Sequence, residues 1–106
     1  MKTLRIRAIA IAFGIGLSAT TAAQAQAPDP LQVRSWAAAC ANCHGTQGVA
    51  QPGMESLAGK NADEMTKQLL DFKAGRKPAT IMHQLARGYS DEQLRQIAAY
   101  FAALKK

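Results

Sequence analysis

Residues 37–46, AAACANCHGT, hold both cysteines of the chain and one of its two histidines within five positions. On a helix, Cys40, Cys43 and His44 stand at positions i, i+3 and i+4, so their side chains leave from one face. The C-x-x-C-H spacing is typical of haem c attachment, in which two thiols bond to porphyrin vinyl groups and the histidine binds the iron from the same side. The stretch therefore predicts a helix that carries one covalent haem c.

Three other kinds of site can use the same residues. A thioredoxin-like redox pair also has C-x-x-C, but it belongs near a βαβ pattern, which this sequence lacks. A zinc site could combine Cys40, Cys43, His44 and His83, although adjacent residues such as Cys43 and His44 rarely converge on one tetrahedral ion. A disulfide between Cys40 and Cys43 would close a very short loop and leave His44 without a role.

The beginning of the chain is typical of a secretory signal peptide. Three basic residues within the first seven precede an apolar run, Ala8–Leu17, that is too short to span a bilayer. A-x-A cleavage patterns follow at 23–25 and 25–27. We expect removal of residues 1–25, a mature domain of residues 26–106 and a periplasmic location; a membrane anchor is the alternative if the signal is not cleaved.

Charge and size limit the functions open to the mature chain. Of the 13 Lys and Arg residues, three lie in the expected signal peptide, so ten remain against seven Asp and Glu, a net charge of +3 instead of +6. The basic residues are scattered and few aromatics are present to stack on bases, so we do not expect nucleic-acid binding. A chain of about 80 residues usually needs a disulfide, a metal or a cofactor to stabilise its core.

The first half of the mature sequence predicts one helix and one long loop. Asp29 offers an N-cap oxygen, and Pro30 fits the first helical turn, where its missing N–H costs nothing. The helix is expected to run to about His44, with one face formed by Val33, Trp36, Ala37 and Cys40. Residues 45–60 contain four glycines and a proline, which predict a loop.

The second half predicts two helices with a short helical segment between them. One helix runs from Asn61 to Gly75, with Glu64 in the capping-box position, and the last begins at Ser90, with Gln93 in that position. Residues 79–88 predict one or two turns. The expected inward-facing side chains are Met65, Leu69 and Phe72 in the first helix and Leu94, Ile97, Ala98, Phe101 and Leu104 in the last. No strand pattern appears, so we expect an all-α fold of three or four helices.

Several motifs together resemble those of the class I monohaem cytochromes c of the small bacterial type. These motifs are CANCHG, SLAG, ATIM and GYSDEQ followed by a closing amphipathic helix. Residues 72–104, FKAGRKPATIMHQLARGYSDEQLRQIAAYFAAL, are especially similar to the haem-binding subunit of flavocytochrome c sulfide dehydrogenases. The resemblance covers essentially the whole mature chain and implies a cytochrome c fold packed around one covalently attached haem c.

The resemblance also implies a methionine as the second iron ligand, and Met82, 38 residues after His44, matches the family pattern. Met65 lies on the inward stripe of its helix and is expected to pack in the core. Met54 lies only ten residues after His44, so the chain would have to double back over the haem. His83 is the other candidate, but neighbours on a helical turn point about 100° apart, so only one of Met82 and His83 can face the iron.

The ligand pair determines the expected function. A His/Met pair fills both axial positions of the iron and leaves none open for oxygen or peroxide, so we expect a one-electron carrier and not an enzyme. Two roles stay open: a subunit that accepts electrons from a sulfide-oxidising flavoprotein, and a free electron shuttle between periplasmic redox enzymes. A ligand-binding or peroxidatic haem protein is a third interpretation.

The resemblance implies finer features as well. Glu55 stands before SLAG, where the family commonly has proline, and a backbone carbonyl of this loop is expected to accept the ring N–H of His44. The first and last helices are expected to cross at Ala37, Ala38 and Ala39 against Tyr100 and Phe101. Expected core or haem-contacting residues are Leu57, Leu69, Leu70, Ile81, Leu85, Leu94 and Ile97.

Charge placement gives a weaker indication of partners. Basic residues flank the expected methionine side and could steer an acidic partner; they are Lys60, Lys67, Lys73, Arg76, Lys77 and Arg87. Acidic residues are interleaved with them, so ordinary solvated lysines remain an equal interpretation.

Overall fold

The computed structural model describes residues 27–106. Residues 1–26, which contain the predicted signal peptide and its cleavage boundary, lie outside the described part. The described chain forms four helices, α1 (Pro30–His44), α2 (Ala62–Lys73), α3 (Met82–Arg87) and α4 (Asp91–Ala103), and these residues contain no strand. The all-α prediction is therefore confirmed for this part of the chain.

Side-chain caps begin helices α2 and α4 where the sequence predicts them. In α4 both halves of the capping box form: the Gln93 amide donates to Ser90 Oγ at 3.1 Å, and the Ser90 amide donates to Gln93 Oε1 at 2.8 Å. In α2 the Asn61 side chain accepts from the amides of Asp63 and Glu64. Within residues 27–106 the Asn61 amide does not donate to the Glu64 side chain, so only half of the predicted capping box forms there.

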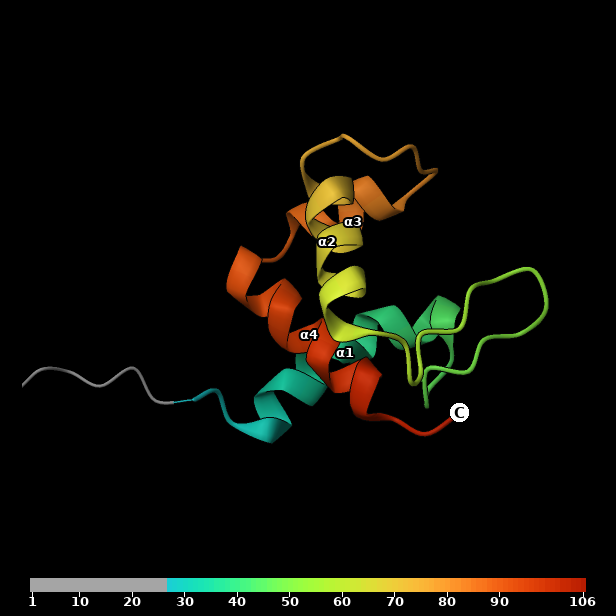
Figure 1. Cartoon of the computed structure of the whole chain (residues 1–106), viewed down its shortest axis with the longest axis vertical. Helices are drawn as coiled ribbons and strands as arrows, with labels where there is room; N and C mark the ends of the chain where they lie inside the picture. Colours follow the sequence, from blue (N-terminus) through green and yellow to red (C-terminus); the bar gives the residue numbers. More distant parts are fainter. Residues whose placement is uncertain (1–26) are drawn as a thin grey trace, which may run out of the picture.

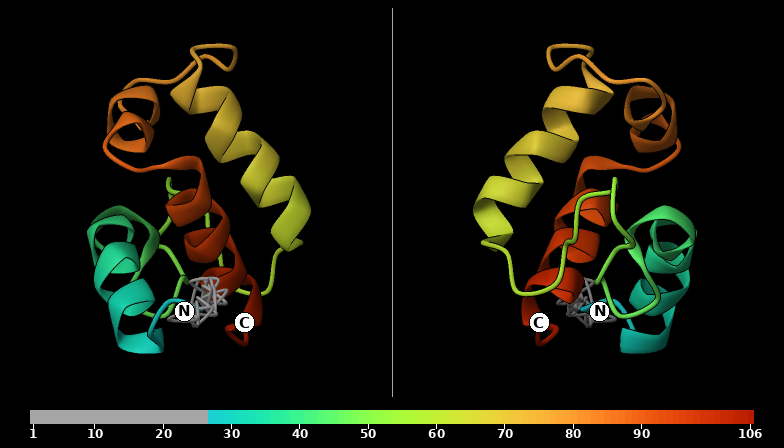
Figure 2. Two further views of the ribbon diagram at one scale, coloured as in Figure 1. Left: turned by 90° about the vertical axis from the view of Figure 1, so that its left-hand side faces the viewer. Right: turned by 90° about the vertical axis from the view of Figure 1, so that its right-hand side faces the viewer.

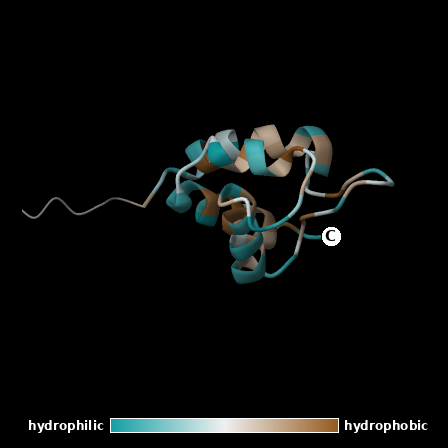
Figure 3. Cartoon of the chain, turned by 90° about the horizontal axis from the view of Figure 1, so that it is seen from above, coloured by the Kyte–Doolittle hydropathy of each residue, from teal (hydrophilic) through white to brown (hydrophobic). Residues whose placement is uncertain are grey.

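Helix α4 is the centre of the fold, because it packs against both α1 and α2, while α3 packs against α2 (Figure 2). The core is a cluster of buried side chains from α1, α2 and α4: Ala37, Met65, Ile97, Ala98 and Phe101. Hydrophilic residues are spread along all of the helices (Figure 3), although some apolar side chains, such as Leu31 in α1 and Leu85 in α3, are exposed as well. The core is small, which agrees with the expectation that the domain needs a further stabilising element.

The crossing of α1 and α4 corrects one prediction. Ala37 is 1% exposed and faces Ala98 and Phe101 in the core, but Ala38 and Ala39 are exposed. Successive helical residues turn by about 100°, so only the first of the three alanines can face α4.

Two loops project from the helices on the same side of the molecule (Figure 1). One connects α1 to α2 and spans residues 45–61; the other connects α2 to α3 and spans residues 74–81. Helix α2 ends at Lys73, two residues before the predicted Gly75, and Ala74 forms its C-cap. None of the helices in residues 27–106 combines the length and the apolarity needed to cross a bilayer.

Candidate functional site

The last turn of α1 carries the three residues of the C-x-x-C-H stretch, as the sequence predicts. Cys40 is half-buried, Cys43 is exposed, and both thiols are free. Burial raises the pKa of the Cys40 thiol. Helix α1 ends directly after His44, where Gly45 adopts φ 88° and its amide donates to the Ala41 carbonyl at 3.0 Å. The three side chains therefore lie in one turn, with the helix end next to them.

The His44 ring is oriented by a backbone carbonyl. Its Nδ1 lies 2.5 Å from the carbonyl oxygen of Glu55. A carbonyl can only accept, so this partner assigns the hydrogen to Nδ1 and leaves the lone pair of Nε2 free to bind a metal. Burial, and then the charge of Lys60, lower the pKa of His44, which favours the neutral imidazole that binds metals.

The identity of this carbonyl could not be read from the sequence, because any residue can supply a backbone oxygen. The sequence indicates only which loop supplies the carbonyl: Glu55 stands before SLAG, at the place where the resemblance implies a proline. The Glu55 side chain instead pairs with Lys60.

Hydrogen bonds of the residues directly after Glu55 hold this part of the loop. The Gly48 carbonyl accepts from the amides of Leu57 and Ala58 at 2.8 and 2.9 Å. Ser56 Oγ accepts from the Ala50 amide at 2.8 Å. The segment directly after Glu55 is thus fastened to the segment that directly follows α1, which fixes the Glu55 carbonyl relative to His44.

Burial and position distinguish the remaining candidate iron ligands from one another. Met65 is 5% exposed within the core cluster, so its predicted packing role is confirmed. Met54 is 48% exposed and directly precedes Glu55, so it belongs to the loop that contacts His44. Met82 and His83 are both half-buried and form the first two residues of α3.

Exposed apolar side chains lie in the segments that carry these ligands. Val49 and Met54 in the first loop are 52% and 48% exposed, and Ile81 and Leu85 at α3 are 54% and 43% exposed. Large apolar side chains left exposed on a small domain mark surface that another group can cover. The two thiols and the imidazole nitrogen in the last turn of α1, together with the apolar loop that contacts His44, fit the attachment of a haem c.

The alternative sites fit the geometry less well. A four-ligand zinc site requires His83 to join the cysteine pair. Within residues 27–106 no three His, Cys, Asp or Glu side chains are arranged to hold a metal ion. A thioredoxin-like site requires a βαβ unit, and the described chain has no strand.

The predicted basic surface is partly neutralised by local ion pairs. Four of the six basic residues pair with carboxylates: Lys60 with Glu55, Lys67 and Arg76 with Asp71, and Lys73 with Asp91. The hydrogen bonds from Lys67 and then Arg76 hold the pKa of Asp71 below its ordinary value, and Lys73 does the same for Asp91. Paired charges project little field, so the solvated-lysine interpretation agrees better with the structure.

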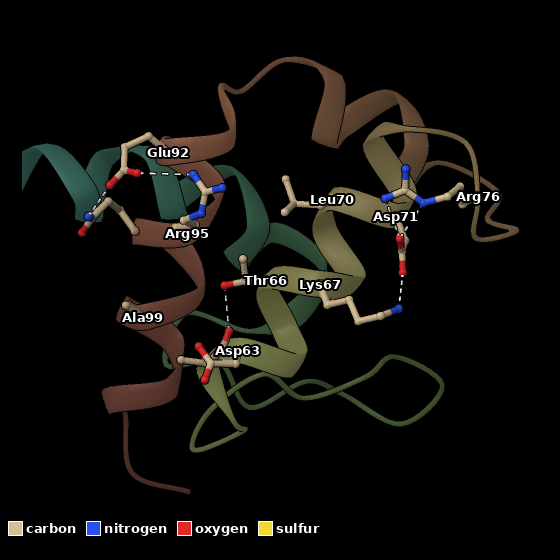
Figure 4. Close-up of a pocket in the computed structure, with 11 residues that line it drawn as sticks. Asp63, Thr66, Lys67, Leu70, Asp71, Arg76, Glu92, Arg95 and Ala99 are labelled. Atoms are coloured by element: carbon tan, nitrogen blue, oxygen red, sulfur yellow. Dashed lines mark hydrogen bonds and ion pairs between the residues drawn. The ribbon is translucent and has the colours of Figure 1, made fainter.

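A separate surface groove lies between α2 and α4 (Figure 4). Leu70 and Ala99 line it together with the ion pairs of Asp71 with Arg76 and of Glu92 with Arg95. None of the predicted haem ligands lines this groove.

Comparisons with known proteins show what this chain is similar to. Residues 32–101 match the family model described as cytochrome C oxidase, cbb3-type, subunit III. The chain is 40% identical over 68 residues to the cytochrome subunit of sulfide dehydrogenase from Chlorobaculum tepidum, and 41% identical over 70 residues to a thiosulfate dehydrogenase electron acceptor from Stutzerimonas stutzeri. Both matches cover 64% of this chain, but 62% of the first relative and 32% of the second.

A solved structure of cytochrome c4 from Acidithiobacillus ferrooxidans shares the fold. It is 33% identical, with a TM-score of 0.60, and the match covers 62% of this chain and 39% of that one. The chain therefore spans less than two thirds of the length of each of these proteins.

Proposed function

The chain belongs to the cytochrome c family, whose cofactor is a covalently attached haem c, and on this premise we propose that it carries single electrons. The observation that carries the proposal is the hydrogen bond from His44 Nδ1 to the Glu55 carbonyl, next to the free thiols of Cys40 and Cys43. This arrangement leaves Nε2 as a neutral nitrogen ligand beside two attachment points.

Four side chains hold the cofactor in this proposal. Cys40 and Cys43 would form the thioether links, and His44 Nε2 and the Met82 sulfur would bind the iron. Bound haem iron supplies the one-electron chemistry, since it changes between ferric and ferrous forms. The roles of Cys40, Cys43 and His44 are supported by their common turn, and that of Met82 by its place at the start of α3, after a loop on the same side as the loop that contacts His44 (Figure 1).

The chain's own groups set the conditions for electron transfer. The Glu55 carbonyl fixes the His44 ring, so the ring does not have to reorient when the iron changes charge. The exposed apolar side chains of the two loops and of α3 would cover the bound cofactor and exclude water from it. With His44 and Met82 both bound to the iron, no position would be open for a substrate, which favours a carrier over an enzyme or a ligand-binding haem protein.

Two partner roles are supported by different relatives. The Chlorobaculum tepidum relative is a cytochrome subunit of sulfide dehydrogenase, which supports the role of an electron-accepting subunit of a sulfide-oxidising flavoprotein. The Stutzerimonas stutzeri relative is an electron acceptor of thiosulfate dehydrogenase, which supports a free shuttle. The signal-peptide pattern of residues 1–25 supports a periplasmic location and a mature domain of residues 26–106 for both roles.

Absorption spectra of the protein, exported in a host with haem c maturation machinery, test the proposal. We expect sharp c-type bands in the reduced form and a weak sulfur-to-iron band in the far red of the oxidised form. Haem without the far-red band would exclude methionine and move the second ligand to His83 or leave the site open. Absence of covalent haem would overturn the proposal itself.

Copurification separates the two partner roles. A flavoprotein that remains bound to the chain through washes with concentrated salt would establish the subunit role. A monomeric chain that reduces several unrelated acceptors rapidly would establish the shuttle.

A further inference from the structure

Hydrogen bonds to α2 hold only the first half of the loop between α2 and α3. Its first half, residues 74–77, is hydrogen-bonded back to the last turns of α2. Its second half leads directly to Met82, and residues 78–80 take part in none of the hydrogen bonds found within residues 27–106. Because residues 78–80 lack such bonds, their path depends on the position of residue 77 before them and on the start of α3 after them.

Asp71 holds the first half through both its backbone and its side chain. Its carbonyl accepts from the amides of Arg76 and Lys77 at 2.9 and 3.3 Å. Its Oδ1 accepts from Nε and Nη2 of Arg76, both at 2.8 Å, and its Oδ2 accepts from Lys67 at 2.7 Å (Figure 4). The Asp71 side chain is 17% exposed, whereas that of Arg76 is 64% exposed. Asp71, on the helix, is thus the more buried partner, and it holds Arg76 of the loop.

We propose that Asp71 is a positioning residue for Met82: by holding Arg76 it sets the path of the loop that brings the methionine sulfur to the iron. The proposal rests on the proposed function, since it requires Met82 as a ligand. A thioether is neutral, so no charge attracts it to the iron. Its binding therefore depends on the loop's being ordered beforehand, which lowers the entropic cost of forming the bond.

The competition between Met82 and an added ligand measures this effect directly. Imidazole would be titrated into the oxidised, haem-loaded protein, and loss of the far-red sulfur-to-iron band would report the displacement of Met82. In Asp71→Asn and in Arg76→Gln we expect the apparent affinity for imidazole to rise about threefold to fivefold, the size expected for partly exposed charged hydrogen bonds. The double variant should bind no more tightly than either single variant, because both remove the same contact.

Asp63→Asn is the matched control. Asp63 lies on the same helix and lines the same groove, but its side chain makes none of the contacts to the loop (Figure 4). We expect this variant to bind imidazole as the unaltered protein does. An equal increase in Asp71→Asn and Asp63→Asn, without an increase in Arg76→Gln, would attribute the effect to net charge and overturn the proposal.

The remaining outcomes separate this inference from the proposed function. If the unaltered protein lacks the far-red band, Met82 is not the ligand and both fail. If it has the band, but Asp71→Asn and Arg76→Gln bind imidazole as it does, only the positioning role fails. A lower melting temperature in these variants without a change in imidazole affinity would likewise assign Asp71 a merely structural role.

Discussion

Gly45→Ala is expected to destabilise the protein by displacing the loop that orients His44. Gly45 has φ 88° and ψ 145°, a region that is essentially restricted to glycine and costs other residues about 1–3 kcal/mol. A Cβ at this position would lie 1.9 Å from the Val49 carbonyl oxygen and 2.6 Å from its carbon. Both are backbone atoms, so no side-chain rotation relieves the overlap and the turn itself must shift.

The shift adds to the cost of the backbone conformation. The hydrogen bond from the Gly48 amide to the Gly45 carbonyl, 2.8 Å long, closes this turn, and its loss costs about 1 kcal/mol. The free energy of unfolding should therefore fall by about 3 kcal/mol in total. Because Gly48 also accepts from Leu57 and Ala58, the displacement reaches the segment next to Glu55 and should alter the reduction potential as well.

Denaturant unfolding of the oxidised protein, followed by haem absorbance, measures the change, with Gly53→Ala as the control. Gly53 also has a positive φ, 94°, but a Cβ there would meet no atom within 4 Å. The control should lose only the conformational cost of about 1–2 kcal/mol. Both variants lower the entropy of the unfolded chain equally, so that term cancels between them. If Gly45→Ala loses no more stability than Gly53→Ala, the reasoning about the Val49 contact is wrong.

Three further predictions follow from the ligands and the ion pairs. Replacing both Cys40 and Cys43 with alanine should abolish covalent haem on a denaturing gel and leave an unstable apoprotein; a folded variant that retains haem would contradict the attachment sites. Met82→Ala should remove the far-red band, lower the reduction potential and open the iron to added imidazole, whereas an unchanged spectrum would mean that another residue is the ligand. Lys73 holds the pKa of Asp91 below its ordinary value, so this carboxylate contributes stability above about pH 4 that is lost as the pH falls further. Asp91→Asn should make thermal stability less dependent on pH in that acidic range, and an unchanged pH profile would show that the ion pair contributes nothing.

The helices could be predicted from the sequence because their signals are local. The proline after Asp29 and the capping box at Ser90 act over a few residues, and both structures form as predicted. The inward stripe of α4 was predictable for the same reason, since apolar residues at helical spacing share one face.

The contacts between distant segments could not be predicted in the same way. The partner of His44 is a backbone oxygen, which leaves no trace in residue type, and it lies 11 residues away across a loop. The pairing of Asp71 with Arg76 could not be predicted either, because the two residues stand five positions apart and meet only through the path of the loop after α2. The three alanines of α1 were predicted as a group, although helical geometry allows only one of them to face α4.

The contact to His44 comes from a backbone carbonyl. The number of residues in this loop therefore matters more for the contact than the type of residue at position 55. A substitution at position 55 keeps the carbonyl, so the side chain at this position can vary while the contact to His44 is retained. An added or deleted residue between Gly48 and Ala50, or between Ser56 and Ala58, would break the hydrogen bonds that join these two segments and would shift the Glu55 carbonyl. The turn at residues 51–54 lies between these segments and is exposed, with open space beside Gly53. A peptide tag inserted at this turn would thus offer a way to attach the protein to an electrode while the ligand geometry is preserved.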